Sequence, residues 1–513
     1  MLAKTRLGFA AIPAVAAVLI FSALVWIGAS GVRGSDQYWY VADVESIVDG
    51  HGVQTNEIYP VAIRHEMLPL PRPFVHNILN TYLAAGPAVL LGAYEGWIAL
   101  NFLSGLLTAF LIFRTVVSVT DSRPAASAVA ATYLVLPLTI WLTTQPMAEA
   151  SIAPLAALAV YLYITAGVSY WRWTLLLMVV VLLVYCRESF VLLLPLVPAG
   201  YVAHTRPLQL AKIGGAAGLV AIGGGLWLLG KFLFEPYISL SYLQVIASAG
   251  PNVSNMNTYF DLTRDTPTIS AILTKAIHGL AVQFAEINIG YFLFYLPFNV
   301  LMLSPLVVLL TRRRAQVDRV VVAVTAAVIL HLITVVIVQN QFRYLLSATP
   351  PLLAAAGVLV SRLSNHRAFS WLPVGVTTTV ILILSVPSAA LAWRSHTDAL
   401  LERDTCGALA RAFNETVPFE DTVMVAVDLS TGYDAQRLGY VLRPRRTLFV
   451  SDRYNPDDYA ALIHNAKAEW LISRRDSPIF KRLSPSVAHE ARVLPSAFSD
   501  WSIFSLENTS DLP

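Results

Sequence analysis

The fold is decided by residues 7–29, LGFAAIPAVAAVLIFSALVWIGA, together with residues 35–52, SDQYWYVADVESIVDGHG. The first stretch has no charged side chain, and as a helix it is long enough to cross about 30 Å of hydrocarbon. Lys4 and Arg6 precede it. It exceeds the apolar core of a signal peptide in length and lacks a clean small-residue cleavage site. We therefore predict a retained membrane anchor with a cytoplasmic N-terminus.

The composition extends this interpretation to most of the chain. The 513 residues are 56% hydrophobic and only 13% charged, whereas soluble proteins carry about 25% charged residues. Residues 395–513 hold 30 of the 67 charged side chains. We predict a membrane module over residues 1–394 and an extracytoplasmic α/β domain over residues 395–513. A soluble enzyme, a secreted disulfide scaffold and a basic nucleic-acid binder are excluded.

Further apolar runs mark the other membrane spans. They lie near residues 97–119, 125–144, 149–168, 209–234, 284–311, 317–339, 343–361 and 370–393. The run at 172–203 is longer than one span and is interrupted by Arg187 and Glu188, which predicts two short helices that meet at a polar break. The predicted fold is a mostly α, polytopic transmembrane helical bundle of about eleven spans.

The charges of the loops set the orientation. Residues 75–92 are barely long enough to span. If they form a re-entrant or interfacial helix, 13 basic residues share the side of Lys4, including the cluster Arg312–Arg314. This is the arrangement that the positive-inside rule requires. The outer face then carries a first loop over residues 30–96 and a second over residues 235–283. The second loop is either a lid over the lipid donor, for which it is long enough, or a passive connector.

The C-terminal domain alternates short β-branched runs with amphipathic segments. We predict strands over residues 422–427, 447–450, 469–472 and 501–506, and helices over residues 434–441 and 456–466. No G-x-G-x-x-G follows the first strand, so a docking or acceptor-contacting role is favoured over dinucleotide binding. Tyr433, Asp434, Arg437 and the group Arg443–Arg446 could contact a polar acceptor. Solvated surface charge is the simpler interpretation of these residues.

The segment after the first span predicts a short amphipathic helix in the membrane interface. Four apolar side chains share one face at helical spacing: Tyr40, Val44, Ile47 and Val48. Gly50 ends the helix, and Asp36 stands at its beginning. Asp36 has two interpretations at this stage. It is either a helix cap, which accepts backbone N–H bonds and suits the helix dipole, or a functional carboxylate.

This segment resembles the first outer loop of the GT-C glycosyltransferases, the polytopic group that includes protein O-mannosyltransferases and aminoarabinose transferases. In that family the leading aspartate of an acidic pair is the catalytic base, and Asp36 matches it. Gln37 replaces the second acidic residue. The resemblance implies a GT-C-like bundle with interfacial helices in the first outer loop.

Four further segments resemble family motifs in the same order. These are residues 72–77 (RPFVHN), 101–107 (NFLSGLL), 184–188 (VYCRE) and 341–346 (QFRYLL). The resemblance implies that the substrate is contacted by five side chains: His76, Glu149, Arg187, Arg343 and Tyr344. The family arginine of the 101–107 motif is absent here, because Asn101 takes its place.

Elementary electrostatics points to the same groups. Glu149, Arg187 and Arg343 lie at or near membrane depth, where an ionised side chain costs about 2.5–3.5 kcal/mol. They should face a polar cavity or pair with one another. Glu149 either orients the acceptor or holds a metal. His65 and Glu66 are weaker metal candidates; no cofactor is identified, and a divalent cation is the one considered.

The chemistry of a lipid-phosphate donor fits these residues. The phosphate is a good leaving group, so the reaction needs a base, Asp36, and cations for the phosphate, Arg187 and Arg343. We predict an inverting, mannosyltransferase-like enzyme that moves a hexosyl or pentosyl unit from a polyprenyl-phosphate sugar to an extracytoplasmic acceptor hydroxyl on a glycan, lipid or protein. The excess of arginine over lysine favours a bacterial plasma membrane. The alternatives are a polytopic transporter or lipid flippase, and a non-enzymatic scaffold.

Overall fold

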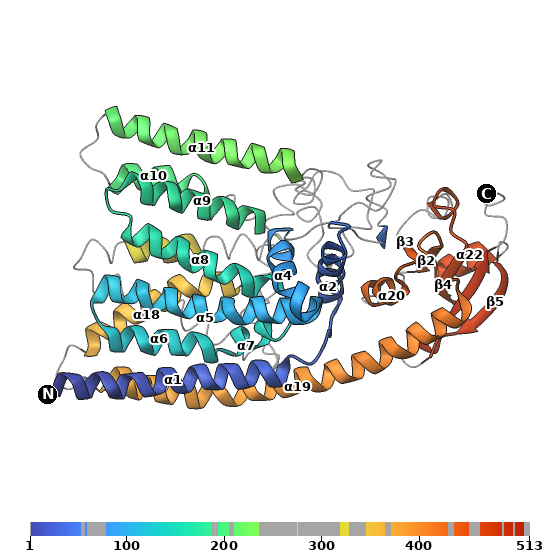
Figure 1. The fold of residues 1–513 in the computed structure, drawn as a ribbon, viewed down its shortest axis with the longest axis horizontal. Coiled ribbons are helices and arrows are strands. Elements are labelled where there is room, and N and C mark those ends of the chain that lie inside the picture. The colour runs from blue at the N-terminus through green and yellow to red at the C-terminus, as the bar shows by residue number, and fades with distance from the viewer. Residues whose placement is uncertain are drawn as a thin grey trace.

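The chain forms a helical bundle with a small sheet domain at one end (Figure 1). The computed structural model describes residues 2–52, 57–58, 78–186, 190, 193–204, 210–234, 274, 319–327, 345–364, 371–428, 435–450, 462–484, 487–495 and 498–506. The N-terminus and the sheet domain lie at opposite ends of the molecule. We call the end of the bundle that faces the sheet domain the distal end.

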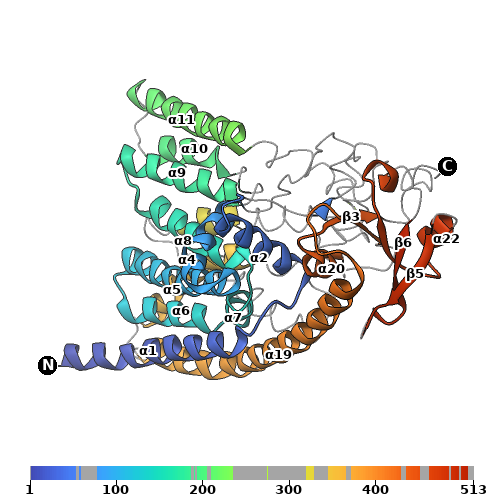
Figure 2. The ribbon, with the colours of Figure 1, turned by 45° about the vertical axis from the view of Figure 1, so that its right-hand side comes forward.

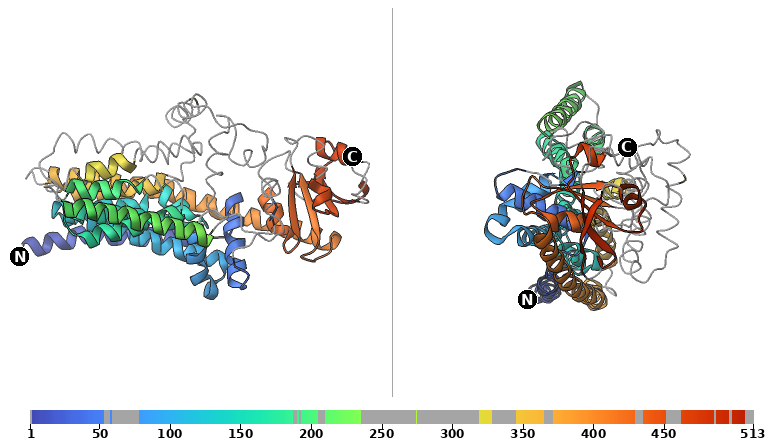
Figure 3. Two further views of the ribbon diagram at one scale, coloured as in Figure 1. Left: turned by 90° about the horizontal axis from the view of Figure 1, so that it is seen from above. Right: turned by 90° about the vertical axis from the view of Figure 1, so that its right-hand side faces the viewer.

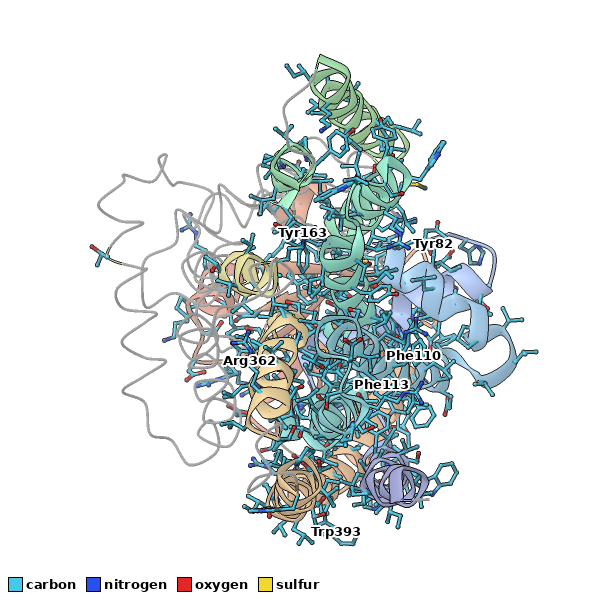
Figure 4. All side chains as sticks on the ribbon, turned by 90° about the vertical axis from the view of Figure 1, so that its left-hand side faces the viewer. Tyr82, Phe110, Phe113, Tyr163, Arg362 and Trp393 are labelled. Atoms are coloured by element: carbon cyan, nitrogen blue, oxygen red, sulfur yellow. The ribbon has the colours of Figure 1, made fainter. Side chains whose placement is uncertain are left out.

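The bundle is built from apolar helices that lie side by side. They are α1 (Leu2–Gly28), α5 (Ala93–Thr120), α6 (Arg123–Val135), α7 (Pro137–Thr143), α8 (Ala148–Thr165), α9 (Tyr170–Cys186), α10 (Leu196–His204), α11 (Leu210–Phe234), α18 (Leu345–Ser364) and α19 (Leu372–Thr416). Helices α1 and α11 lie on opposite sides of the bundle (Figure 2). Seen end-on, Tyr82 and Trp393 lie at its periphery (Figure 4). Helices that are apolar all round belong in lipid or in a large core.

Several described helices meet the requirements for a membrane span. Helices α5, α8, α18 and α19 are long and apolar enough, and the pair α6 and α7, bent by 54°, would make a fifth. The bend falls at Pro137, which has no backbone N–H to continue a helix. Helices α9 and α10 are separate, as predicted for residues 172–203, whereas the predicted break at Arg187 and Glu188 lies outside the described residues. The expected spans at 284–311 and most of 317–339 lie outside the described residues, so the count of about eleven stays a prediction.

Two short helices run across the bundle at its distal end. They are α2 (Ser35–Val48) and α4 (Ile78–Leu91) (Figures 1 and 3). Helix α4 has 14 residues and is about 21 Å long, less than the roughly 30 Å of hydrocarbon. Gly92, at φ 97°, turns the chain back into α5. This geometry favours the interfacial placement that we predicted for residues 75–92.

Helix α19 connects the bundle to the sheet domain without a break. Trp371 and Trp393 are 61% and 63% exposed, and no charged residue lies between them. Their 22-residue separation corresponds to about 33 Å of helix, close to the thickness of the hydrocarbon core. Exposed tryptophans are typical of the two membrane interfaces. Helix α19 therefore leaves the membrane near Trp393 and continues to Thr416, so the predicted boundary at 394 falls inside one helix.

Contacts between α1, α7 and α19 show that the end of α1 lies at the same level as Trp393, where α19 leaves the membrane. A Cβ on Gly28 would lie 3.4 Å from Ala392 Cα and 2.6 Å from Thr144 Cγ2. Ser30, just after α1, forms a hydrogen bond of 2.6 Å with His396 Nδ1. The ends of α1 and α7 and the middle of α19 thus meet at the distal membrane boundary.

The C-terminal domain is a six-stranded sheet covered by helices. Its elements are β1 (Glu57–Ile58), β2 (Met424–Asp428), β3 (Arg446–Val450), β4 (Trp470–Arg474), β5 (Val487–Val493) and β6 (Trp501–Leu506), with α20 (Ala435–Leu442) and α22 (Pro478–Leu483). The strand order is β1-β3-β2-β4-β6-β5. The first four strands in this order are parallel to one another, β6 is antiparallel to β4, and β5 is antiparallel to β6.

The four predicted strands are confirmed within two residues, and the first predicted helix is α20. Most of the helix expected at 456–466 lies outside the described residues. Strand β5 was not predicted, because three charged or polar residues, His489, Glu490 and Arg492, interrupt it and none of its seven residues is buried. Strand β1 comes from the first outer loop and pairs with β3 through Glu57 and Ile58. The sheet domain is therefore completed by a segment some 370 residues earlier in the sequence.

Arg445 corrects the prediction that the Arg443–Arg446 group is solvated surface charge. Its side chain is fully buried. The guanidinium donates to Pro418 O at 2.8 Å, to Val417 O at 2.7 Å and to Asn414 Oδ1 at 3.0 Å. These acceptors lie at the C-terminal end of α19, where helix carbonyls lack intrahelical partners. Arg445 therefore ties α19 to the sheet domain.

Replacement of Arg445 by leucine should destabilise the C-terminal domain by about 3 kcal/mol or more, because several buried acceptors lose a charged donor. The measurement is thermal unfolding in detergent, followed by protease cleavage of the domain. Arg411→Leu, an exposed site on the same helix, should change stability by about 0.5 kcal/mol or less. Equal melting of the two variants would contradict this role.

Candidate functional site

The first turn of α2 carries Asp36. Gly34 is the N-cap residue, in extended conformation at φ −156° and ψ 165°, and the helix begins at Ser35. Asp36 is therefore the second helical residue and does not occupy the N-cap position. A carboxylate in the first turn still suits the helix dipole. The structure describes the backbone of Asp36, whereas its side chain is outside the description.

A buried amide pair joins α2 to the bundle. Gln37 is 5% exposed, and its Nε2 donates to Gln145 Oε1 at 2.6 Å. Gln37 Oε1 accepts the backbone N–H of Arg33 at 3.0 Å. The residue that replaces the second acidic residue of the family pattern thus has a structural function. It fixes the first turn of α2 against the segment between α7 and α8.

Asn101 of α5 holds the segment between α7 and α8 in place. It is fully buried on α5, and its amide donates to Gln145 O at 2.7 Å and to Met147 O at 3.2 Å. Glu149 follows in the first turn of α8 and is 4% exposed. A chain of buried hydrogen bonds therefore connects the turn that carries Asp36 with the turn that carries Glu149. Sequence reasoning singled out Asn101 only as a position where the family arginine is missing.

Arg33 is a cation at this site that the sequence analysis missed. Its Nη2 donates to the carbonyl and hydroxyl oxygens of Thr144 at 3.1 and 3.2 Å. Burial lowers the pKa of Arg33 to about 10, so the guanidinium stays charged at neutral pH. Its position in the sequence could have identified it, because Arg33 is the one basic residue between the first span and Asp36.

A second side of α2, which carries Tyr38, faces the C-terminal domain. Tyr38 is buried, and its hydroxyl donates to Glu402 Oε1 on α19 and lies 3.0 Å from Cys406 Sγ. Arg437 of α20 donates to both carboxylate oxygens of Glu402. Helix α2 was predicted as a short amphipathic helix in the membrane interface, and this placement stays a prediction. At the distal end it packs between the bundle and the sheet domain, with Val48 exposed.

The remaining predicted site residues lie outside the described part of the chain. These are His65, Glu66, His76, Arg187, Arg343 and Tyr344. Cys186, next to Arg187, is the last residue of α9, and its thiol donates to Asn80 Oδ1 of α4 at 3.4 Å. Helix α9 therefore ends at the distal end, beside α4.

Helix α18, which begins at Leu345, also starts toward the distal end. A Cβ on Gly357, in the second half of α18, would lie 2.6 Å from Val116 Cγ2 near the end of α5. Helix α5 starts at the distal end, directly after α4, so its last turns lie at the other end. The first residue of α18, Leu345, is fully buried. Cys186 at the end of α9 and Leu345 at the start of α18 thus both lie toward the end that carries α2.

The described residues contain no cluster of three or more His, Cys, Asp or Glu side chains that could hold a metal ion. Glu149 is the one metal candidate within the described ranges, and no second carboxylate or imidazole of these ranges joins it in such a cluster. The requirement for a divalent cation stays a prediction.

The fold resembles those of an aminoarabinose transferase, ArnT, and of an archaeal oligosaccharyltransferase, as expected from the sequence resemblance to GT-C glycosyltransferases. It is similar to ArnT from Cupriavidus metallidurans in the apo state, with a TM-score of 0.59, 13% identity and 98% coverage of both chains. The same protein bound to undecaprenyl phosphate also has a TM-score of 0.59, at 12% identity, covering 97% of this chain and 98% of that chain.

An archaeal enzyme shares the fold over a smaller part of its length. The oligosaccharyltransferase AglB from Archaeoglobus fulgidus, in complex with an inhibitory peptide and a dolichol-phosphate, has a TM-score of 0.51 at 12% identity. The match covers 91% of this chain and 69% of that chain. No protein-family model matches the sequence, and no curated protein matches it.

Replacement of Asn101 by leucine keeps the branching and the number of heavy atoms of the side chain and removes the donor to the 144–147 segment. We expect a loss of about 2–4 kcal/mol of stability, because buried carbonyls lose their partner. Thr115→Val on the same helix is the matched control. The buried Thr115 hydroxyl donates to Leu111 O of its own helix, and its removal should cost less than about 1 kcal/mol. Thermal unfolding in detergent compares them, and equal melting temperatures would argue against the proposed support.

Proposed function

We propose that the protein is a membrane glycosyltransferase that moves a sugar from a polyprenyl-phosphate donor to an acceptor hydroxyl at the distal, extracytoplasmic end. The observation that carries this proposal is the 2.6 Å hydrogen bond between Gln37 and Gln145. It brings the turn with Asp36 and the turn before Glu149 together at the membrane boundary, in the fold shared with ArnT.

The ligands of the similar structures support the class of donor. One ArnT structure is bound to undecaprenyl phosphate, and one AglB structure contains a dolichol-phosphate and a peptide. Both lipids are long isoprenoid phosphates that reside in a membrane. A site at the distal boundary, near the level of Trp393, lets such a phosphate lie at the membrane surface while its chain stays in lipid. The transporter and scaffold alternatives lack a comparable observation.

The proposed reaction is a single displacement. The acceptor oxygen attacks the anomeric carbon, the bond from that carbon to the phosphate oxygen breaks, and the electron pair leaves with the phosphate. The carboxylate of Asp36 takes the acceptor proton. Because the leaving phosphate is already a stable anion, no general acid is required.

The other predicted residues complete the site in this proposal. Arg187 and Arg343 hold the leaving phosphate, since a planar guanidinium matches two phosphate oxygens. Glu149 orients the acceptor or holds a divalent cation, and His76 and Tyr344 contact the substrates. The sugar is a hexosyl or pentosyl unit. The N-terminus faces the cytoplasm, and the membrane is the bacterial plasma membrane.

Replacement of Asp36 by asparagine should leave the fold intact and reduce transfer by about 10²–10⁴-fold, the usual contribution of a general base. The assay incubates purified protein with a panel of radiolabelled polyprenyl-phosphate sugars and an acceptor extract. Asp49→Asn, at the exposed C-cap of the same helix, is the control and should keep full activity. An Asp36→Asn variant with wild-type transfer would remove Asp36 from the mechanism.

A single displacement at the anomeric carbon also predicts the stereochemistry of the product. The glycosidic bond of the product should have the configuration opposite to that of the donor. Proton NMR coupling constants at the anomeric centre measure this directly. Retention of configuration would require a covalent intermediate on the enzyme or a different mechanism.

A further inference from the structure

The C-terminal domain touches α2 through one charged group in particular, Glu402. This residue is 8% exposed and lies on α19, nine residues beyond Trp393, which corresponds to about 13 Å of helix above the membrane boundary. It accepts the hydroxyl of Tyr38 from one side and two guanidinium nitrogens of Arg437 from the other, with Nη2 at 2.7 Å from Oε2. One carboxylate thus joins three separate helices.

Tyr38 remains a hydrogen-bond donor under all working conditions. Burial, together with the nearby Cys406 and Glu402, raises the pKa of Tyr38 far above its ordinary value. Its ring also packs against the ring of Tyr440 of α20, with centroids 5.0 Å apart and an interplanar angle of 40°. The contact between α2 and the C-terminal domain is therefore both packed and directional.

A second contact, at Glu45, lies about two helical turns beyond Tyr38 along α2. Glu45 accepts Arg443 Nη1 at 2.6 Å and the hydroxyl of Tyr440 at 3.2 Å. The Arg443 and Glu45 side chains are 26% and 37% exposed, so solvent weakens this ion pair. The buried contact through Glu402 is the stronger restraint of the two.

The order of residues in α2 shows what the restraint does. Gln37 and Tyr38 are consecutive, and their side chains leave a helix about 100° apart. Gln37 binds the bundle, and Tyr38 binds α19. Two anchors in different directions fix both the position of the first turn and its rotation about the helix axis. Asp36 is the residue directly before them.

We propose that Glu402 is a positioning residue, which holds Tyr38 and thereby orients the first turn of α2 for the reaction at Asp36. This inference rests on the proposed function. It assigns the C-terminal domain a task in catalysis, since that domain supplies Arg437, which in turn orients Glu402. Glu402 itself does not contact the reacting atoms in this proposal.

The test uses Tyr38→Phe, Glu402→Ala and the double variant in the full-length protein. Each single variant should lower kcat about 10-fold or more, because a small displacement of a catalytic group is costly, and leave the KM for the lipid donor unchanged. The double variant should be no slower than the slower single variant, since both changes remove one contact. Additive losses, or a rise in KM with normal kcat, would overturn the proposal.

The matched control is Glu415→Gln. Glu415 also lies on α19 and forms an ion pair with Arg492 of β5, but this pair is exposed and does not reach α2. The variant should keep wild-type kcat. A loss equal to that of Glu402→Ala would show that any weakened contact between α19 and the domain has the same effect, which contradicts a specific role of Glu402.

Cys406 provides a readout that does not depend on activity. The chain has two cysteines, and the other, Cys186, is fully buried. Burial raises the pKa of Cys406, and Glu402 raises it further. Glu402→Ala should therefore increase the rate of maleimide labelling at Cys406 several-fold, through a more acidic thiol and a looser contact. Labelling at the wild-type rate would contradict the proposal.

The two proposals fail in different ways. If Asp36→Asn is inactive while Tyr38→Phe and Glu402→Ala have wild-type kcat, the positioning role is wrong and the proposed function stands. If Asp36→Asn retains full activity, the assignment of the base is wrong, whatever the Glu402 variants show.

Discussion

The hydrogen bond between Gln37 and Gln145 is the interaction on which the distal end of this protein depends. Two uncharged amides meet at the membrane boundary, where an ionised side chain without a partner would be costly and an unsatisfied amide nearly so. Their pairing lets a non-spanning helix, α2, enter the polar end of a bundle whose helices are otherwise apolar. Asn101 on α5 stabilises the same turn further, because its amide donates to the backbone carbonyls of Gln145 and Met147.

The elements of the fold were predictable where the physical signal is local. Hydropathy located the helices of the bundle, because spans must be apolar over a fixed length. The excess length of the apolar run at 172–203 and its charged pair predicted two helices there, and α9 and α10 are separate. Alternating β-branched runs located four strands of the C-terminal sheet. Strand β1 could not be found in this way, because two residues carry no periodicity and their partner strand is remote in sequence.

The candidate site was predictable only in part, because contacts between residues that are distant in the sequence leave no local pattern. Asp36 and Glu149 were singled out by residue type, position and family resemblance, and the structure brings their turns together through Gln37. The partnership of Tyr38 with Glu402 spans 364 positions, and no local pattern reports it. Arg445 was misjudged because a run of arginines looks like surface charge, whereas the carbonyls at the end of α19 can be seen only once the chain is folded.

Helix α19 joins the helical bundle and the C-terminal domain as one continuous element. A break at the membrane surface would let the domain swing, since a flexible linker transmits position poorly. The 45-residue helix instead continues through the boundary near Trp393, and Glu402 lies on its rigid extramembrane part. Arg445 fixes the far end of this helix to the sheet, and Ser30 contacts it at the membrane surface. The position of α2 is consequently defined by the same rigid element that carries the sheet domain, so the domain and the first outer loop cannot move independently without breaking buried hydrogen bonds.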